Sequence, residues 1–154
     1  MEQNWEEALT KLKVGSSGGR PAVHKPLLVL LLVARARAGK PNRVSFREIA
    51  EPLEKLIATH GPPVKKPNAA LPFWHLQSDG FWKVMEREEL AGTEGKLGRK
   101  SLAKHDVVGE FDARAWAALQ KDPKLAQRVT AKILERYWTA GERAKVEREF
   151  GARG

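Results

Sequence analysis

The fold is decided by the stretch PLLVLLLVARAR at residues 26–37, which contains the longest apolar run of the chain. The run from Leu27 to Ala34 is eight residues long, and by composition alone it fits either a buried strand or a buried helix. Its leucine content and its continuation into Arg-Ala-Arg favour the helix. Pro26 suits a first helical turn, because the N–H that proline lacks would have no partner there. We therefore expect a buried helix that begins at Pro26 and ends before Gly39.

The composition of the chain is that of one globular domain. It has 154 residues, of which 42% are hydrophobic, enough for one core and too many for a disordered segment. We therefore expect a single domain over residues 1–154. No cysteine is present, which excludes disulfides and zinc–thiolate sites. The longest apolar run is too short to span a membrane and the acidic start of the chain is unlike a signal peptide, so we expect a cytoplasmic protein with no membrane partner.

Basic residues are concentrated in two acid-free segments. Lysine and arginine total 28 against 19 aspartate and glutamate, which gives the chain a net charge of +9. Between Glu7 and Glu48 there are nine cations and no acid, and a second acid-free cluster includes Lys96, Arg99 and Lys100. Such clusters favour a surface that follows a phosphate backbone over one that merely keeps the protein soluble. We therefore expect nucleic acid as the partner.

Capping signals mark the starts of the other expected helices. Ser45 with Glu48 three residues later is a capping box, and Pro52 must then kink or divide the helix that follows. Asp112 and Asp122 are expected to cap two later helices. The last helix is polar, with alternating basic and acidic residues typical of an exposed surface. Besides the buried helix, the expected helices cover residues 3–13, 45–60, 112–121, 123–139 and 142–150.

Two aromatic-rich segments predict a β-hairpin. Phe73–Gln77 and Phe81–Met85 are separated by Ser-Asp-Gly, and Asp-Gly between such segments is a strong hairpin signal. Two helices followed by a hairpin resemble the layout of a winged helix-turn-helix domain, which docks on duplex DNA. The expected fold class is therefore α+β and mainly α-helical, with winged-helix-like helices and a β-hairpin.

No arrangement of residues indicates catalysis. The four histidines are His24, His60, His75 and His105, and none has a second histidine or a carboxylate at a convincing metal-binding spacing. Asp79 followed by Glu94-Gly95-Lys96 is similar to the pattern of some metal nucleases, but its Glu-x-Lys lies in a glycine-flanked loop. We therefore expect a binding module without a catalytic residue, metal or cofactor. The residues leave open a binder of unmodified DNA such as a regulator, a metal nuclease, and a module that binds an acidic protein.

Two segments resemble a known family. The stretches RPAVHKPLLVLLL at residues 20–32 and LPFWHLQSDGFW at residues 71–82 resemble the DNA sulfur-binding domain of phosphorothioation-dependent, McrA-type restriction endonucleases. The likeness runs from about residue 5 to about residue 140. It implies a reader of phosphorothioated double-stranded DNA in a type IV restriction system of bacterial defence. In that family a neighbouring HNH nuclease domain, which this chain lacks, cuts the DNA.

The resemblance also implies a shallow apolar cavity for the sulfur atom. Sulfur is larger and more weakly hydrated than oxygen, so an ordinary phosphate oxygen would lose hydration there without gaining a hydrogen bond. The resemblance places this sulfur pocket at Leu71, Pro72 and His75, with Phe73 or Trp74 supporting it from below. Related domains often carry an aromatic ring at the position of Leu71 and a smaller side chain at that of His75.

The remaining DNA contacts are likewise implied by the resemblance. Residues before the buried helix would meet the modified phosphate or a neighbouring base, a later loop would read bases, and other lysines would contact phosphates. Arg99 is the expected bidentate partner of a guanine in the major groove. The contact residues, in these three groups, are Arg20, His24 and Lys25; Arg99, Lys100 and Ser101; and Lys65, Lys66 and Lys96.

Overall fold

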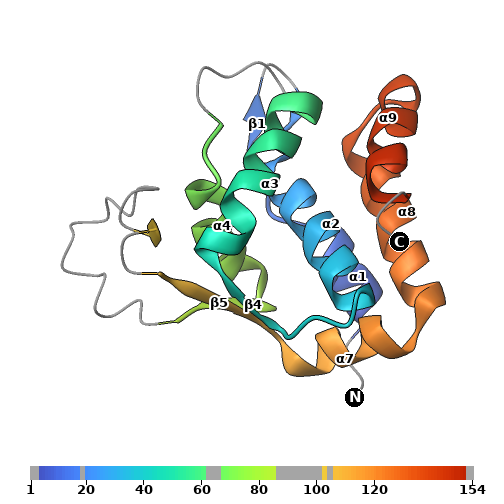
Figure 1. Cartoon of the computed structure of the whole chain (residues 1–154). Coiled ribbons are helices and arrows are strands. Elements are labelled where there is room, and N and C mark those ends of the chain that lie inside the picture. Colours follow the sequence, from blue (N-terminus) through green and yellow to red (C-terminus); the bar gives the residue numbers. More distant parts are fainter. Residues whose placement is uncertain (1–3, 18–19, 62–66, 86–101, 104–105, 152–154) are drawn as a thin grey trace.

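Helices make up most of the described chain. The computed structural model describes residues 4–17, 20–61, 67–85, 102–103 and 106–151 (Figure 1). The helices are α1 (Trp5–Thr10), α2 (His24–Arg37), α3 (Phe46–His60), α4 (Ala70–His75), α7 (Ala113–Lys121), α8 (Pro123–Tyr137) and α9 (Ala140–Gly151), with a 3₁₀ helix, η1, at Leu76–Asp79. The strands are β1 (Ser16–Ser17), β2 (Arg20–Pro21), β3 (Arg43–Ser45), β4 (Trp82–Val84) and β5 (Val108–Phe111). The predicted α+β, mainly helical class is confirmed.

Helix α2 is the centre of the core, and its composition explains this. Every residue from Pro26 to Val33 is buried, and the helix contacts α3, α4, α7, α8 and α9, which surround it in Figure 1. A helix that is apolar on all sides has to be enclosed in this way. Pro26 lies in its first turn, and the chain leaves the helix through Gly39 with a φ of 79°. The predicted buried helix is therefore confirmed, but it begins at His24, two residues before Pro26.

The capping predictions are confirmed as well. Ser45 and Glu48 form the capping box at the start of α3, each side chain bonding the other residue's backbone N–H at 3.4 Å. Asp112 and Asp122 each accept two backbone N–H groups at the starts of α7 and α8. Such a cap stabilises a helix by about 1 kcal/mol. Pro52 lies inside α3, which continues through it as one helix.

A three-stranded antiparallel sheet joins segments that are far apart in the sequence. The strand order is β3-β5-β4, so β5 is the central strand. Gly109 of β5 pairs with Val44 on one side and Val84 on the other. A Cβ atom at Gly109 would lie 1.9 Å from the Trp82 ring, so only glycine leaves room for this indole. The sheet therefore depends on a close approach between β5 and an aromatic side chain of β4.

The predicted hairpin is wrong. Its first expected strand, Phe73–Gln77, is helical in α4 and η1, and the second contributes only β4, whose partner is β5. Pro72 is compatible with α4 because it lies in the first turn, where an N–H needs no helical partner. Gly80, with a φ of 91°, ends η1 rather than a strand. The Asp-Gly signal thus marks a turn, but the turn follows a helix.

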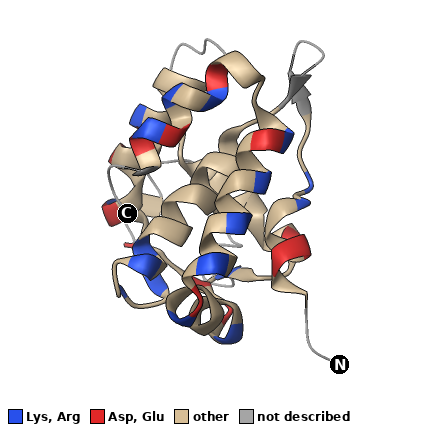
Figure 2. Cartoon of the chain, turned by 90° about the vertical axis from the view of Figure 1, so that its right-hand side faces the viewer, with Lys and Arg blue, Asp and Glu red and all other residues tan. Residues whose placement is uncertain are grey.

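Helices α8 and α9 cover another side of α2. The final polar helix predicted over residues 142–150 is confirmed within α9, which begins two residues earlier. Figure 2 shows both basic and acidic residues on this side of the molecule. Within the described part, no helix has the length and apolarity needed to cross a membrane.

Candidate nucleic-acid interface

A pocket lies between the start of α2, helix α4 and the segment that follows α1. Its volume is about 330 Å³, within the range of small-ligand sites. We call it the α2–α4 pocket. The residues that line it are Lys13, Val14, Gly15, Ala22, His24, Lys25, Leu71, Pro72, His75 and Ser78.

The pocket brings together residues from the two sequence segments that carry the family resemblance. Leu71, Pro72 and His75 come from α4, and His24 comes from the first turn of α2. Phe73, predicted to support the site, does not line the pocket and is fully buried. Its ring stacks on Phe46 with centroids 5.2 Å apart, so its contribution is to hold α4 on the core.

Leu71 gives the pocket an exposed apolar edge. Its side chain is 53% exposed, and among the described residues it is the large apolar residue that the fold leaves open to solvent. A single exposed leucine is common in proteins. Here, however, Leu71 lies at a concave site beside the buried Pro72. The edge therefore offers an apolar contact to a ligand that enters the pocket.

An ion pair closes one wall of the pocket. The Lys25 Nζ atom lies 2.7 Å from Asp79 Oδ2, 2.7 Å from the Lys13 carbonyl oxygen and 3.1 Å from Ser78 Oγ. The other carboxylate oxygen, Asp79 Oδ1, accepts the Lys13 N–H at 2.7 Å. The side chains of Lys25 and Asp79 are only 11% and 3% exposed. The ammonium of Lys25 already has three acceptors within the protein, so the direct DNA contact predicted for it would require one of these to be displaced.

The wall formed by residues 13–15 is held in place by Tyr137, a residue distant in the sequence. The Tyr137 hydroxyl accepts the Leu12 N–H and donates to the Thr10 carbonyl oxygen, both at 3.0 Å. Tyr137 is the last residue of α8 and is buried. This clasp fixes the end of α1 directly before Lys13, and so holds the wall against the start of α2.

Burial lowers the pKa of His24 below its ordinary value of about 6.5. Because protonation is then easier in the unfolded chain, the free energy of unfolding should decrease as pH falls through about 6.5 toward the lower folded-state pKa. Thermal unfolding at pH 7.5 and pH 5.5 measures this decrease. A His24→Gln variant should lose part of it, and a variant that keeps the full decrease would contradict the assignment to His24.

Most of the other predicted DNA contacts lie outside the described residues. Arg20 lies in β2, where its backbone pairs with Ser17, but its side chain is outside the described residues. Six further predicted contacts also lie outside the described residues: Lys65, Lys66, Lys96, Arg99, Lys100 and Ser101. Asp79 was not predicted as part of this site, because the sequence indicated it only as a turn residue or as a carboxylate of a nuclease pattern. No local signal links Asp79 to Lys25, 54 positions earlier.

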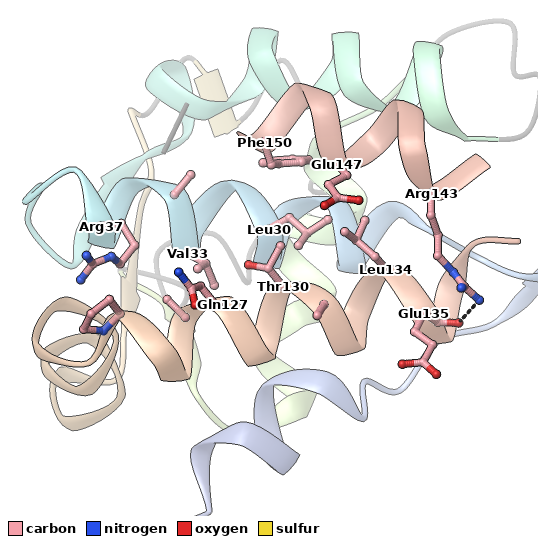
Figure 3. A pocket seen from close by; sticks show the side chains of 14 residues that line it. Leu30, Val33, Arg37, Gln127, Thr130, Leu134, Glu135, Arg143, Glu147 and Phe150 are labelled. Atoms are coloured by element: carbon pink, nitrogen blue, oxygen red, sulfur yellow. Dashed lines mark hydrogen bonds between the residues drawn. The ribbon is translucent and has the colours of Figure 1, made fainter. Parts of the chain in front are cut away.

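A second pocket, between α2, α8 and α9, is less suited to nucleic acid (Figure 3). Its volume is about 630 Å³, and its lining includes Leu30, Leu134 and Phe150. The Arg143 guanidinium at its rim donates to backbone carbonyl groups at the end of α8. The carboxylates of Glu135 and Glu147, also in the lining, form no ion pair among the described residues. Arg37 and Arg143 balance these two carboxylates in the lining, so the pocket lacks the net positive charge that would attract a phosphate.

The titratable residues do not gather into a metal site within the described ranges. No three His, Asp or Glu side chains there lie close enough together to hold an ion. The Asp79 carboxylate, considered above for a nuclease, faces Lys25 and Lys13 instead. Glu94, its proposed partner, lies outside the described residues.

Comparison with known proteins gives consistent matches. The sequence profile of the family described as "ScoMcrA-like, DNA sulfur-binding domain" matches residues 2–154. The fold is similar to the sulfur binding domain of ScoMcrA complexed with phosphorothioated DNA, with a TM-score of 0.81 and 22% identity over 97% of this chain and 96% of that one. It is also similar to the sulfur binding domain of SprMcrA complexed with phosphorothioated DNA, with a TM-score of 0.75 and 20% identity over 99% and 98% of the two chains.

A longer protein matches over part of its length. The type IV phosphorothioation-dependent restriction endonuclease ScoMcrA has a TM-score of 0.79 and 20% identity, over 98% of this chain but only 29% of that one. Among curated proteins, no similar sequence was found.

Proposed function

The chain belongs to the family of ScoMcrA-like DNA sulfur-binding domains, and from this membership we propose that it binds phosphorothioated double-stranded DNA with the sulfur in the α2–α4 pocket. The observation that carries the proposal is the pocket itself, because Leu71, Pro72 and His75 line it together with the first turn of α2. Two proteins with this fold have been solved as complexes with phosphorothioated DNA. The family and the pocket thus support the same ligand.

The apolar edge of the pocket would favour sulfur over oxygen. Leu71 and Pro72 offer apolar contact and no hydrogen-bond donor from their side chains. A phosphate oxygen placed against them would give up water without a replacement, at a cost of about 1–3 kcal/mol. A sulfur atom loses less hydration and gains more dispersion contact. The expected preference for sulfur therefore comes mainly from a penalty on oxygen.

Basic residues around the pocket would hold the duplex and set the sequence context. Arg20 and His24 precede or begin α2, and we propose that they meet the modified phosphate or an adjacent base. For Arg99 we propose a bidentate contact to a guanine, which is worth about 1–3 kcal/mol of discrimination between bases. The remaining predicted contacts, Lys65, Lys66, Lys96, Lys100 and Ser101, would bind the backbone or assist base reading.

We also propose that the chain acts as the non-cleaving reader of a type IV restriction system. This chain matches 29% of the endonuclease ScoMcrA, and the family it matches is described as a DNA sulfur-binding domain, which supports a binding role separate from cleavage. An HNH nuclease domain, in the same protein or in another, is the proposed partner. With Mg²⁺ present, this chain alone should bind a phosphorothioated duplex and leave both strands intact.

A binding titration tests the proposed function. Two duplexes of the same sequence, one with a single phosphorothioate beside a guanine, are titrated at about 0.15 M salt, which suppresses nonspecific attraction. We expect at least a tenfold preference for the modified duplex, which corresponds to about 1.4 kcal/mol from one atom. Equal, salt-sensitive binding to both duplexes would contradict the proposal and indicate a binder of unmodified DNA.

A further inference from the structure

We propose that Asp79 determines specificity by withholding the Lys25 ammonium group from DNA. The inference rests on the proposed function, because it concerns the same pocket. In a basic protein, a lysine at the wall of a DNA-binding pocket would ordinarily be expected to bind phosphate. Here, however, Lys25 forms an ion pair with the buried carboxylate of Asp79. A phosphate that enters the α2–α4 pocket then meets no free charged donor from the Lys25 side chain.

The hydrogen bonds around Lys25 account for all of its donors. An ammonium group has three N–H donors, and Nζ has three acceptors, on Asp79, Ser78 and Lys13. The Ser78 hydroxyl donates its own hydrogen to the His75 carbonyl oxygen at 2.9 Å, which leaves an oxygen lone pair for Lys25. A DNA oxygen could bond Lys25 only by displacing one of these partners.

The ion pair is also well sheltered from solvent. The side chain of Asp79 is 3% exposed, and each of its two carboxylate oxygens has a partner at 2.7 Å. A charge-assisted bond of this length is stronger than one between neutral groups. Because Oδ1 binds the Lys13 N–H and Oδ2 binds Lys25, one carboxylate ties two walls of the pocket together. Asp79 therefore both positions the walls of the pocket and neutralises the Lys25 ammonium.

The consequence for recognition follows from what a free ammonium would do. It would donate a charge-assisted hydrogen bond to an ordinary phosphate oxygen and so remove the penalty on which discrimination against oxygen depends. Sulfur is a poorer acceptor and would gain less. A free lysine would therefore strengthen binding to unmodified DNA most. By holding Lys25, Asp79 keeps unmodified DNA weakly bound.

An Asp79→Asn variant tests this inference with the same two duplexes. The amide oxygen can still accept the Lys13 N–H, but the amide NH₂ cannot accept a bond from Lys25. We expect the affinity for the unmodified duplex to rise about tenfold and the preference for sulfur to fall by a similar factor. If Asp79 only supported the fold, affinity for both duplexes would fall together and the preference would not change.

Two further variants control for the fold. The double variant Asp79→Asn with Lys25→Met removes the freed ammonium, so the wild-type preference for sulfur should return. Ser78→Ala removes one acceptor at an exposed position without altering the carboxylate, and should shift the preference in the same direction as Asp79→Asn but less. Thermal unfolding checks that each variant is folded. Ser78→Ala also keeps the test decisive if Asp79→Asn does not fold.

The outcomes separate the two proposals. A wild-type chain without a preference for sulfur contradicts the proposed function. A wild-type chain that prefers sulfur, with Asp79→Asn or Ser78→Ala leaving that preference unchanged, contradicts the role of Asp79 alone. Failure of the double variant to restore the preference also overturns it.

Discussion

A Leu71→Asp variant is expected to bind phosphorothioated DNA about 100-fold more weakly than the wild type, a loss of about 2.7 kcal/mol. The substitution places a carboxylate at the mouth of the α2–α4 pocket, where a phosphate is proposed to enter, and like charges brought together at an interface cost several kcal/mol. Leu71 is 53% exposed, so the change should leave the fold intact. Fluorescence anisotropy with labelled duplexes measures the affinity, and thermal unfolding checks the fold.

The matched control for this charge is Leu71→Asn. The amide has nearly the shape of the carboxylate but carries no charge, so it should keep most of the affinity for DNA while reducing the preference for sulfur. Loss of affinity in both variants to the same degree would show that the apolar contact, and not charge, dominates. Unchanged affinity in Leu71→Asp would place the DNA elsewhere on the molecule.

A Gly109→Ala variant is expected to lower the free energy of unfolding by about 3 kcal/mol or more. The added Cβ would lie 1.9 Å from the Trp82 ring, so the indole must move. That movement breaks the bond from Trp82 Nε1 to the Phe73 carbonyl oxygen, 2.8 Å long, and disturbs the edge-to-face contact of the two rings. Chemical denaturation measures the difference.

Gly141→Ala is the matched control for the sheet variant. A Cβ at Gly141 meets no atom within 4 Å, and alanine is a better helix former than glycine by about 0.5–1 kcal/mol. The same substitution should therefore be neutral or slightly stabilising in α9. Equal free energies of unfolding for the two variants would show that the Trp82 ring can move away from a Cβ at residue 109 without destabilising the fold.

Local sequence signals predicted most of the helices because the interactions that decide them are local. The Ser45 and Glu48 pair and the two aspartate caps bond to atoms two or three residues away. The burial of α2 follows equally directly from a run of residues with no polar side to expose. For these elements, short-range chemistry and the folded structure agree.

The hairpin prediction failed because tertiary contacts decide the conformation of that segment. The aromatic residues that suggested a strand pack on the core as part of a helix, with Phe73 stacked on Phe46. The partner of β4 is β5, which begins 24 positions after β4 ends and has no turn signal of its own. Alternation of aromatic residues could not distinguish a strand from a helix held by such contacts.

The site was only partly predictable for the same reason. The family resemblance named Leu71, Pro72 and His75, which line one pocket; their contact with sulfur stays a prediction. The Lys25 and Asp79 ion pair joins side chains 54 positions apart, and only the folded chain shows it. Contacts predicted for Arg99 and its neighbours stay predictions because those residues lie outside the described part.

The clasp made by Tyr137 has a consequence for the order in which the protein becomes active during synthesis. The pocket wall at residues 13–15 is translated well before its anchor, because Tyr137 follows Leu12 by 125 residues. A nascent chain that ends before α8 already carries the acid-free basic segment, which attracts any DNA, but it lacks the clasp that shapes the pocket. Selective reading of DNA should therefore begin only after α8 has been made and has folded against α1.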